Sequence, residues 1–286
     1  MKKSTIKLIL ITVGVFLILA GITIYFVMNK IKADQAKLPP VIEEGDVKTT
    51  PVVAEQPTPD SRNEVAVPIL MYHHIRVYNN PEDKTGTNLS VSTENFKAQA
   101  DYLKNSGYTT ITFQQLLDFP TKKLPEKPII LTFDDGYKNG YDVAYRYLKE
   151  NNQIGVFYII SSYLGREDQM TESQVKEISS AGMEIGSHTV GHLDLTTLSS
   201  AKLSRELVDS KSALEAITSK KVISFCYPSG KHNGNVEEAV KNSGYLTAST
   251  TNIAISTTSE NRLTMSRLRI NPADSITGFA GKVTSK

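Results

Sequence analysis

The sequence predicts an α/β fold, a deformed (β/α) barrel preceded by a single N-terminal transmembrane helix. Two observations predict the barrel. From residue 65 onward, short apolar runs alternate with longer amphipathic segments, which is the order expected of βα units around a parallel sheet. Reactive side chains also follow several of these runs, and parallel strands place such groups at one rim. A doubly wound open sheet is the alternative.

Apolar runs predict the strands. The run IILTF at residues 129–133 has the character of a strand that is buried on both faces. The predicted strands are residues 65–72, 129–133, 155–160, 184–187, 222–226 and 246–249. Arg267 and Arg269 alternate along one further strand near the end of the chain.

Capping residues and glycines predict the helices. Ser92 is a suitable N-cap, and Thr171 with Gln174 three residues later forms a capping-box pattern. Glycine follows most of the amphipathic segments and marks their ends. The predicted helices are residues 92–106, 140–150, 171–181, 199–219 and 236–243.

The N-terminus predicts a membrane anchor. Residues 8–28 form a run of 21 residues without charge, and about 20 residues span a hydrocarbon core. The run lacks a small-residue cleavage site at its end, so we favour an uncleaved signal anchor over a cleaved signal peptide. The lysines in residues 1–7 favour a cytoplasmic N-terminus. We therefore expect a single-pass protein of the cell membrane with its catalytic domain outside the cell.

A tether is expected between the membrane and the folded domain. Five of the twelve prolines lie within residues 33–64, among small and polar residues, and such a stretch favours a semi-extended linker. The expected organisation is a cytoplasmic segment, a transmembrane helix, a Pro-rich linker and one catalytic domain. These parts correspond to residues 1–7, 8–28, 29–64 and 65–286.

Composition excludes some classes of partner. The net charge is only +2 and no basic block occurs, so nucleic acid is not an expected partner. The single cysteine, Cys226, excludes a disulfide within the chain. We expect a monomer.

The strand ends predict a catalytic metal site. Asp134 and Asp135 follow one predicted strand, and His188 and His192 follow another in the segment SHTVGH. Two histidines and one carboxylate, with a position open to water, are typical of catalytic zinc. One acid can ligate the cation while the other takes a proton from the attacking water as general base. The alternative for the paired acids is an ordinary turn or helix cap.

The segments TFDDG and SHTVGH resemble the polysaccharide deacetylases, the NodB-homology domain of carbohydrate esterase family four. The likeness covers about residues 65–270. It implies a deformed (β/α) barrel that removes acetyl groups from N-acetylglucosamine in a polysaccharide. It also implies that Asp134 is the base. Asp135, His188 and His192 are then ligands of Zn²⁺ or another divalent metal.

Other motifs of the family match less well. The third motif usually contains an arginine that braces the base, and the corresponding FCYPSG lacks it. Either Arg267 or Arg269 is a candidate replacement. The resemblance still assigns the backbone N–H of Tyr227 to oxyanion stabilisation. Tyr137 and a second tyrosine, Tyr163, are candidate sugar-stacking residues.

The family's late histidine is also missing, since no histidine follows His232. The segment MYHHI resembles the branch whose general acid lies at the start of the domain. This match implies that His73 protonates the leaving amine, with His74 as its neighbour, and an imidazole suits that task near neutral pH.

Two other functions compete with N-deacetylation. The departures from the family motifs are compatible with a catalytically inactive, membrane-anchored protein that binds glycans. A glycoside hydrolase with two acids is the third reading. Adjacent aspartates do not favour it, because the carboxyl groups must flank the scissile bond about 5 to 9.5 Å apart.

Overall fold

The computed structural model describes residues 64–284. The expected cytoplasmic segment, membrane span and almost all of the linker lie outside the described residues, so these boundaries stay predictions. Among the helices of residues 64–284, none has both the length and the apolar character of a membrane span.

A parallel sheet forms the centre of the domain. Its strand order is β10-β9-β8-β7-β6-β2-β12, and β5 pairs with β6 beside this path. All of these pairs are parallel. The strands are β2 (Ile69–Tyr72), β5 (Thr109–Thr110), β6 (Pro128–Phe133), β7 (Val156–Ile159), β8 (Glu184–Ser187), β9 (Ser224–Cys226), β10 (Thr247–Ser249) and β12 (Leu268–Arg269). The predicted α/β fold with a parallel sheet is therefore confirmed.

One segment near the C-terminus contacts both edges of this sheet. Ser249, at the end of β10, forms a parallel bridge with Met265, and β12 pairs with β2 at the other edge. Residues 265–270 thus span the gap between the edge strands, and the sheet has the form of a half-barrel.

Helices follow the strands and cover the sheet. They are α2 (Lys84–Asn88), α3 (Thr93–Asn105), α4 (Phe113–Leu117), α5 (Arg146–Glu150), α6 (Glu172–Ser180), α7 (Ser200–Thr218), α8 (Gly234–Asn242) and α9 (Ile276–Thr284). Ser92 caps α3, and Thr171 with Gln174 forms the expected capping box of α6. The helix predicted over residues 140–150 consists of a π-helical turn, Gly140–Tyr145, followed by α5.

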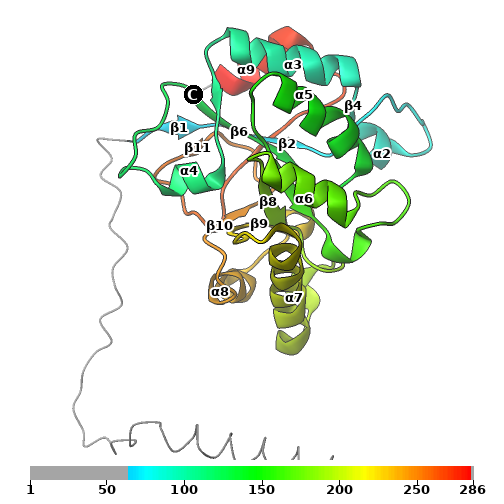
Figure 1. The fold of residues 1–286 in the computed structure, drawn as a ribbon, viewed down its shortest axis with the longest axis vertical. Coiled ribbons are helices and arrows are strands. Elements are labelled where there is room, and N and C mark those ends of the chain that lie inside the picture. Colours follow the sequence, from blue (N-terminus) through cyan, green and yellow to red (C-terminus); the bar gives the residue numbers. More distant parts are fainter. Residues whose placement is uncertain (1–63, 285–286) are drawn as a thin grey trace, which may run out of the picture. The chain divides into compact units, whose positions relative to one another are not determined.

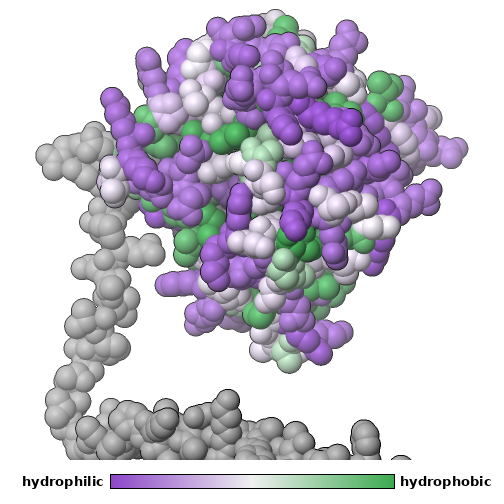
Figure 2. Space-filling model, viewed as in Figure 1, coloured by the Kyte–Doolittle hydropathy of each residue, from purple (hydrophilic) through white to green (hydrophobic). Residues whose placement is uncertain are grey.

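The two faces of the sheet belong to separate apolar clusters. Along β6, Ile129, Leu131 and Phe133 pack in a cluster that also holds side chains of α3, α5, α6 and α7, whereas Ile130 lies in a second cluster with Phe113 of α4. This alternation follows from the two-residue period of a strand. Figure 1 shows α3, α5, α6 and α7 along one side of the sheet and α4 apart from them. The outer face in Figure 2 is mostly hydrophilic.

Short elements connect the main ones. The strand predicted over residues 65–72 is divided at Pro68, because proline offers no N–H to a ladder. Its first part, β1 (Ala66–Val67), pairs antiparallel with β11 (Ser256–Thr257). After β2, β3 (His74–Ile75) pairs with β4 (Ser90–Val91). The short 3-10 and π turns are η2 (Gly140–Tyr145), η3 (Ser161–Tyr163), η4 (Leu195–Thr197) and η5 (Pro228–Gly230).

Candidate functional site

The C-terminal ends of four strands bring the predicted site residues together. His73 follows β2, the paired acids follow β6, His188 follows β8 and Tyr227 follows β9. Because all of these strands run in parallel, their carboxyl ends share one rim of the sheet. Asp134, Asp135 and His188 are almost completely buried there.

Three side chains form a compact group of possible metal ligands. Oδ1 of Asp135 lies 3.3 Å from Nε2 of His188 and 3.6 Å from Nε2 of His192. All three ligand atoms lie within 4.8 Å of one another. Zinc bonds of about 2.0–2.2 Å at a tetrahedral angle separate neighbouring ligand atoms by about 3.3–3.6 Å. The donor set and its spacing therefore fit a divalent cation such as Zn²⁺.

A local hydrogen bond orients the His188 imidazole. Its Nδ1 donates to the carbonyl oxygen of Cys226 at 2.7 Å, and its Nε2 faces Asp135. Such a second partner commonly fixes the tautomer of a metal-ligating histidine. The segment SHTVGH is a tight loop rather than a helical turn, because Thr189 and His192 both have left-handed φ values of 69° and 56°.

Arg267 braces Asp134. Its guanidinium donates from Nη1 to Oδ1 and from Nη2 to Oδ2 of Asp134, both at 2.8 Å. The arginine side chain is fully buried, and its remaining N–H groups donate to the Thr132 hydroxyl, the Thr250 carbonyl and Sγ of Cys226. Of the two arginines named from the sequence, Arg267 makes this contact, whereas Arg269 is half-buried in β12. The brace missing from the third motif thus comes from the segment that spans the sheet edges.

The paired arginine keeps Asp134 ionised. Burial would raise the pKa of Asp134. The charge and hydrogen bonds of Arg267, together with the charges of His73 and His188, outweigh burial and hold that pKa below its usual value. Cys226 lies beside this pair, because its Sγ is 3.2 Å from Nη2 of Arg267 and 3.6 Å from Oδ2 of Asp134. Burial raises the pKa of the Cys226 thiol, so the thiol stays neutral and adds no second anion.

His73 stands on the other side of the acid. Its Nε2 lies 3.8 Å from Oδ2 of Asp134, and its side chain is 13% exposed. Burial lowers the pKa of His73, although the charges of Asp134 and Asp135 partly oppose this effect. A buried imidazole with a lowered pKa gives up its proton readily once it carries one.

The resemblance assigns the backbone N–H of Tyr227 to the oxyanion, and the structure gives this group a partner within the sheet. It donates to the carbonyl oxygen of Ser249 at 3.1 Å. This bond continues the β9–β10 ladder, in which Cys226 pairs with Ser249. The Tyr227 hydroxyl donates to the carbonyl of Leu263. Both donors of this residue are therefore engaged within the fold.

Other residues named from the sequence have their partners as well. The ring of His74 stacks on Tyr137 at 3.5 Å between centroids, so one face of Tyr137 is covered and a sugar cannot use it. The guanidinium of Arg166 lies 4.1 Å from the ring centroid of Tyr163. His232 is bonded to Glu237 at 2.7 Å.

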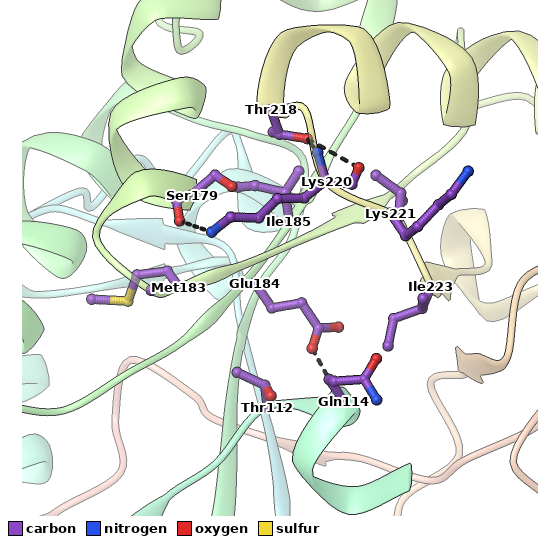
Figure 3. A pocket seen from close by; sticks show the side chains of 12 residues that line it. Thr112, Gln114, Ser179, Met183, Glu184, Ile185, Thr218, Lys220, Lys221 and Ile223 are labelled. Carbon is purple, nitrogen blue, oxygen red and sulfur yellow. Dashed lines mark hydrogen bonds between the residues drawn. The ribbon is translucent and has the colours of Figure 1, made fainter. Parts of the chain in front are cut away.

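A cavity of about 280 Å³ lies elsewhere in the domain. Figure 3 shows Glu184, Thr112 and Gln114 on its wall. Glu184 is the first residue of β8, whereas His188 follows the last. The cavity therefore lies at the amino end of this strand, away from the aspartates and histidines. The carboxylate of Glu184 already accepts hydrogen bonds from the Gln114 backbone and from Ser224.

Known proteins share the sequence pattern of this chain. The profile of the polysaccharide deacetylase family matches residues 121–248. Bacillus subtilis YxkH, a protein named for this family, is 31% identical over 221 residues, which cover 77% of this chain and 76% of YxkH. The poly-beta-1,6-N-acetyl-D-glucosamine N-deacetylase of Staphylococcus aureus is 26% identical over 198 residues, covering 61% of this chain and 68% of that enzyme.

Solved structures share the fold. The Streptococcus pyogenes deacetylase PplD, solved in complex with acetate, superposes with a TM-score of 0.71 at 30% identity, over 77% of this chain and 98% of PplD. The Bacillus cereus polysaccharide deacetylase BC0361 gives a TM-score of 0.71 at 33% identity, over 77% of this chain and 70% of BC0361. With the buried aspartate pair and the two histidines at one rim, these matches show that the chain belongs to the polysaccharide deacetylase family.

Proposed function

We propose that this chain is a metal-dependent N-deacetylase that removes acetyl groups from N-acetylglucosamine residues of an extracellular or cell-wall polysaccharide. One observation carries the proposal. Asp135, His188 and His192 present ligand atoms at zinc-like spacing, and the neighbouring Asp134 is held by Arg267 outside this ligand set. The S. aureus relative, which is named for poly-beta-1,6-N-acetyl-D-glucosamine, supports this class of substrate.

Each protein group has one task in this proposal. A divalent cation held by Asp135, His188 and His192 would supply Lewis-acid chemistry, lowering the pKa of a water molecule and polarising the acetamide carbonyl. Asp134 accepts the proton of the attacking water as general base. Arg267 keeps that carboxylate ionised and fixes its plane through two parallel bonds.

His73 serves as general acid in this scheme. Its Nε2 lies close to Asp134, so the base and the acid face the same space above the strand ends. The imidazolium of His73 donates its proton to the amine nitrogen as the C–N bond breaks, and acetate and a free amino sugar leave. This acid belongs to the branch of the family that the segment MYHHI resembles.

The setting of the enzyme is part of the proposal. Residues 8–28 anchor the chain in the cell membrane as a single span, with residues 1–7 in the cytoplasm. Residues 29–64 tether an extracellular catalytic domain, residues 65–286, to that span. The uncharged run, the early lysines and the prolines support this arrangement.

The test is acetate release from purified wall and exopolysaccharide fractions, with and without a chelator. We expect release that stops with the chelator and returns when Zn²⁺ is added. We also expect the substitution Asp134→Asn to lower the rate by about 10²–10⁴. Metal-independent release, or full activity of Asp134→Asn, would contradict the proposal.

The acid has its own test. His73→Ala should lower kcat while metal affinity stays unchanged, because His73 is not among the ligands. His232→Ala is the matched control, since this histidine is bonded to Glu237 at the same rim and has no task in the reaction. If both variants turn over like the wild type, His73 is not the acid, although the metal site and the base remain.

A different outcome would favour the alternative, an inactive glycan-binding protein. In that case the protein would bind the metal but release no acetate from any of the glycan fractions. The structure weakens the main argument for that alternative. The arginine absent from the third motif is replaced in space by Arg267, which makes a bidentate contact with Asp134.

A further inference from the structure

Asp135 has an unusual backbone conformation for a residue that ligates a metal. Its φ is 73°, and the next residue, Gly136, has a φ of 74°. A left-handed conformation costs a residue with a Cβ on the order of 1 kcal/mol or more. Such a conformation persists only where surrounding contacts hold it, so the turn after β6 needs support from elsewhere in the chain.

Gln169 provides that support from the loop before α6. With its amide oriented to satisfy both of its polar atoms, its nitrogen donates to the carbonyl oxygens of Asp135 at 2.9 Å and Gly136 at 3.0 Å. The N–H of Met170 donates to the same Gly136 oxygen at 2.9 Å. In return, the N–H of Lys138 donates to the carbonyl of Asp168 at 2.8 Å. The loop and the ligand turn are thus joined on both sides.

Tyr137 follows Asp135 by two residues, and its phenol lies near the Asp135 side chain. Burial and the negative charge of Asp135 raise the pKa of Tyr137. The phenol ring is held in place by His74, which stacks on it with an interplanar angle of 23°. Nδ1 of His74 accepts from the amide nitrogen of Asn139 at 3.0 Å, and the oxygen of that amide accepts from the N–H of Ile75 at 2.8 Å. These hydrogen bonds therefore fix the orientation of the His74 ring against Tyr137.

We propose that Gln169 and Tyr137 are positioning residues that preset Asp135 as a metal ligand, with Gln169 fixing its backbone and Tyr137 its carboxylate. This inference rests on the proposed metal dependence. The inference also gives a role to His74, the second histidine of MYHHI, because its ring holds Tyr137 next to Asp135. Partners of this kind typically account for 10–100-fold in metal affinity.

The test measures Co²⁺ binding to the full-length protein by competition with a chelator, together with the visible absorption spectrum of the bound ion. Gln169→Met keeps the length of the side chain and removes the donor, and Tyr137→Phe removes only the hydroxyl. We expect each variant to bind Co²⁺ 10–100-fold more weakly and to shift the spectrum, because the carboxylate is no longer fixed.

Gln174→Met is the matched control. This glutamine also bonds a backbone group in the same region, the N–H of Thr171, but it does not touch Asp135. Its Co²⁺ affinity and spectrum should equal those of the wild type. Should Gln169→Met unfold, Gln169→Glu retains the side-chain length without the donor, and Tyr137→Phe tests the carboxylate independently.

The possible results distinguish failure of this inference from failure of the proposed metal dependence. Wild-type affinity and spectrum in both Gln169→Met and Tyr137→Phe would overturn this inference while leaving the metal site intact. Absence of Co²⁺ binding by the wild type would overturn the proposed metal dependence itself, and the positioning roles with it. An equal loss of affinity in Gln174→Met would show a general loosening of the loop and would also overturn the inference.

Discussion

At the scale of single residues, the position of Arg267 determines the state of Asp134. The sequence named Arg267 and Arg269 together, because both alternate along one short strand. Only the register of that strand decides which of them points inward, and the register depends on contacts with β2 and β10. Sequence reasoning reached the pair of candidates, but the choice required the tertiary structure.

Arg267→Met should damage both stability and turnover. Breaking a buried ion pair leaves Asp134 uncompensated, which costs about 3–5 kcal/mol, and the protonated acid is then no base at neutral pH. Urea unfolding and acetate release measure the two effects. Arg269→Met is the control, since that side chain is half-buried and lacks the contact with Asp134. Equal losses in both variants would contradict the role of Arg267.

His74 should make the free energy of unfolding depend on pH. Burial and the charge of Arg76 lower the pKa of His74 from 6.5 to about 4, so the folded state favours the neutral ring. The stability that depends on this neutral ring is complete above the unfolded-state pKa. It is lost as the pH falls from about 6.5 toward about 4.

His74→Phe tests this dependence, because a phenyl ring can stack on Tyr137 but cannot titrate. The unfolding free energy of wild type should fall more between about pH 7 and about pH 4.5 than that of the variant, as measured by denaturant titration. Parallel pH profiles for the two proteins would show that His74 is not the group responsible.

At the scale of elements, the strand β8 places His188 through close packing. A Cβ on Gly186 would lie 2.5 Å from two ring carbons of Tyr158 and 2.7 Å from Oγ of Ser224. Only glycine therefore allows β8 to approach β7 and β9 this closely. The position of the loop that carries His188 depends on this approach, since His188 follows Gly186 by two residues.

Gly186→Ala should destabilise the domain by about 1–3 kcal/mol, the usual cost of overpacking a core, and should weaken Co²⁺ binding. Thermal unfolding and chelator competition measure both quantities. Gly281→Ala in α9 is the control: a Cβ there meets nothing within 4 Å, and alanine is the better helix former by about 1 kcal/mol. Destabilisation by Gly281→Ala alone would refute this account.

Patterning predicted the long elements well and the short ones poorly. The predicted strand 129–133 lies within β6, because its continuous apolar run is a local signal. Two-residue strands such as β5 and β11 carry no such signal, since they form only by pairing with other strands. The π-helical turn Gly140–Tyr145 likewise escaped prediction, because its residues also fit an ordinary helix.

At the scale of the whole molecule, the strand ends allowed the site to be predicted. Asp134, Asp135, His188 and His192 were named from two short motifs, and the parallel sheet brings them to one rim. The supporting partners were not foreseen. Gln169 and the engaged N–H of Tyr227 depend on loop geometry and ladder register, which a single sequence does not encode in recognisable patterns.

The proposed anchor makes a prediction for the entire chain. The full-length protein should sediment with membranes, whereas a chain that begins at residue 64 should stay in the soluble fraction. Both should release acetate at equal rates from a soluble N-acetylglucosamine oligomer, because the site lies within residues 64–284. Mass spectrometry of the mature N-terminus completes the test. Loss of residues 1–28 from the mature protein would replace the anchor by a cleaved signal.

The contact between Arg267 and Asp134 also has a consequence for biosynthesis. A chain leaving the ribosome presents Asp134 133 residues before its guanidinium partner. Until Arg267 emerges, packing the strands around that lone carboxylate is opposed by the cost of desolvating it. We therefore expect the strands around Asp134 to finish packing only after Arg267 has been synthesised, so that a chain truncated before residue 267 stays incompletely folded.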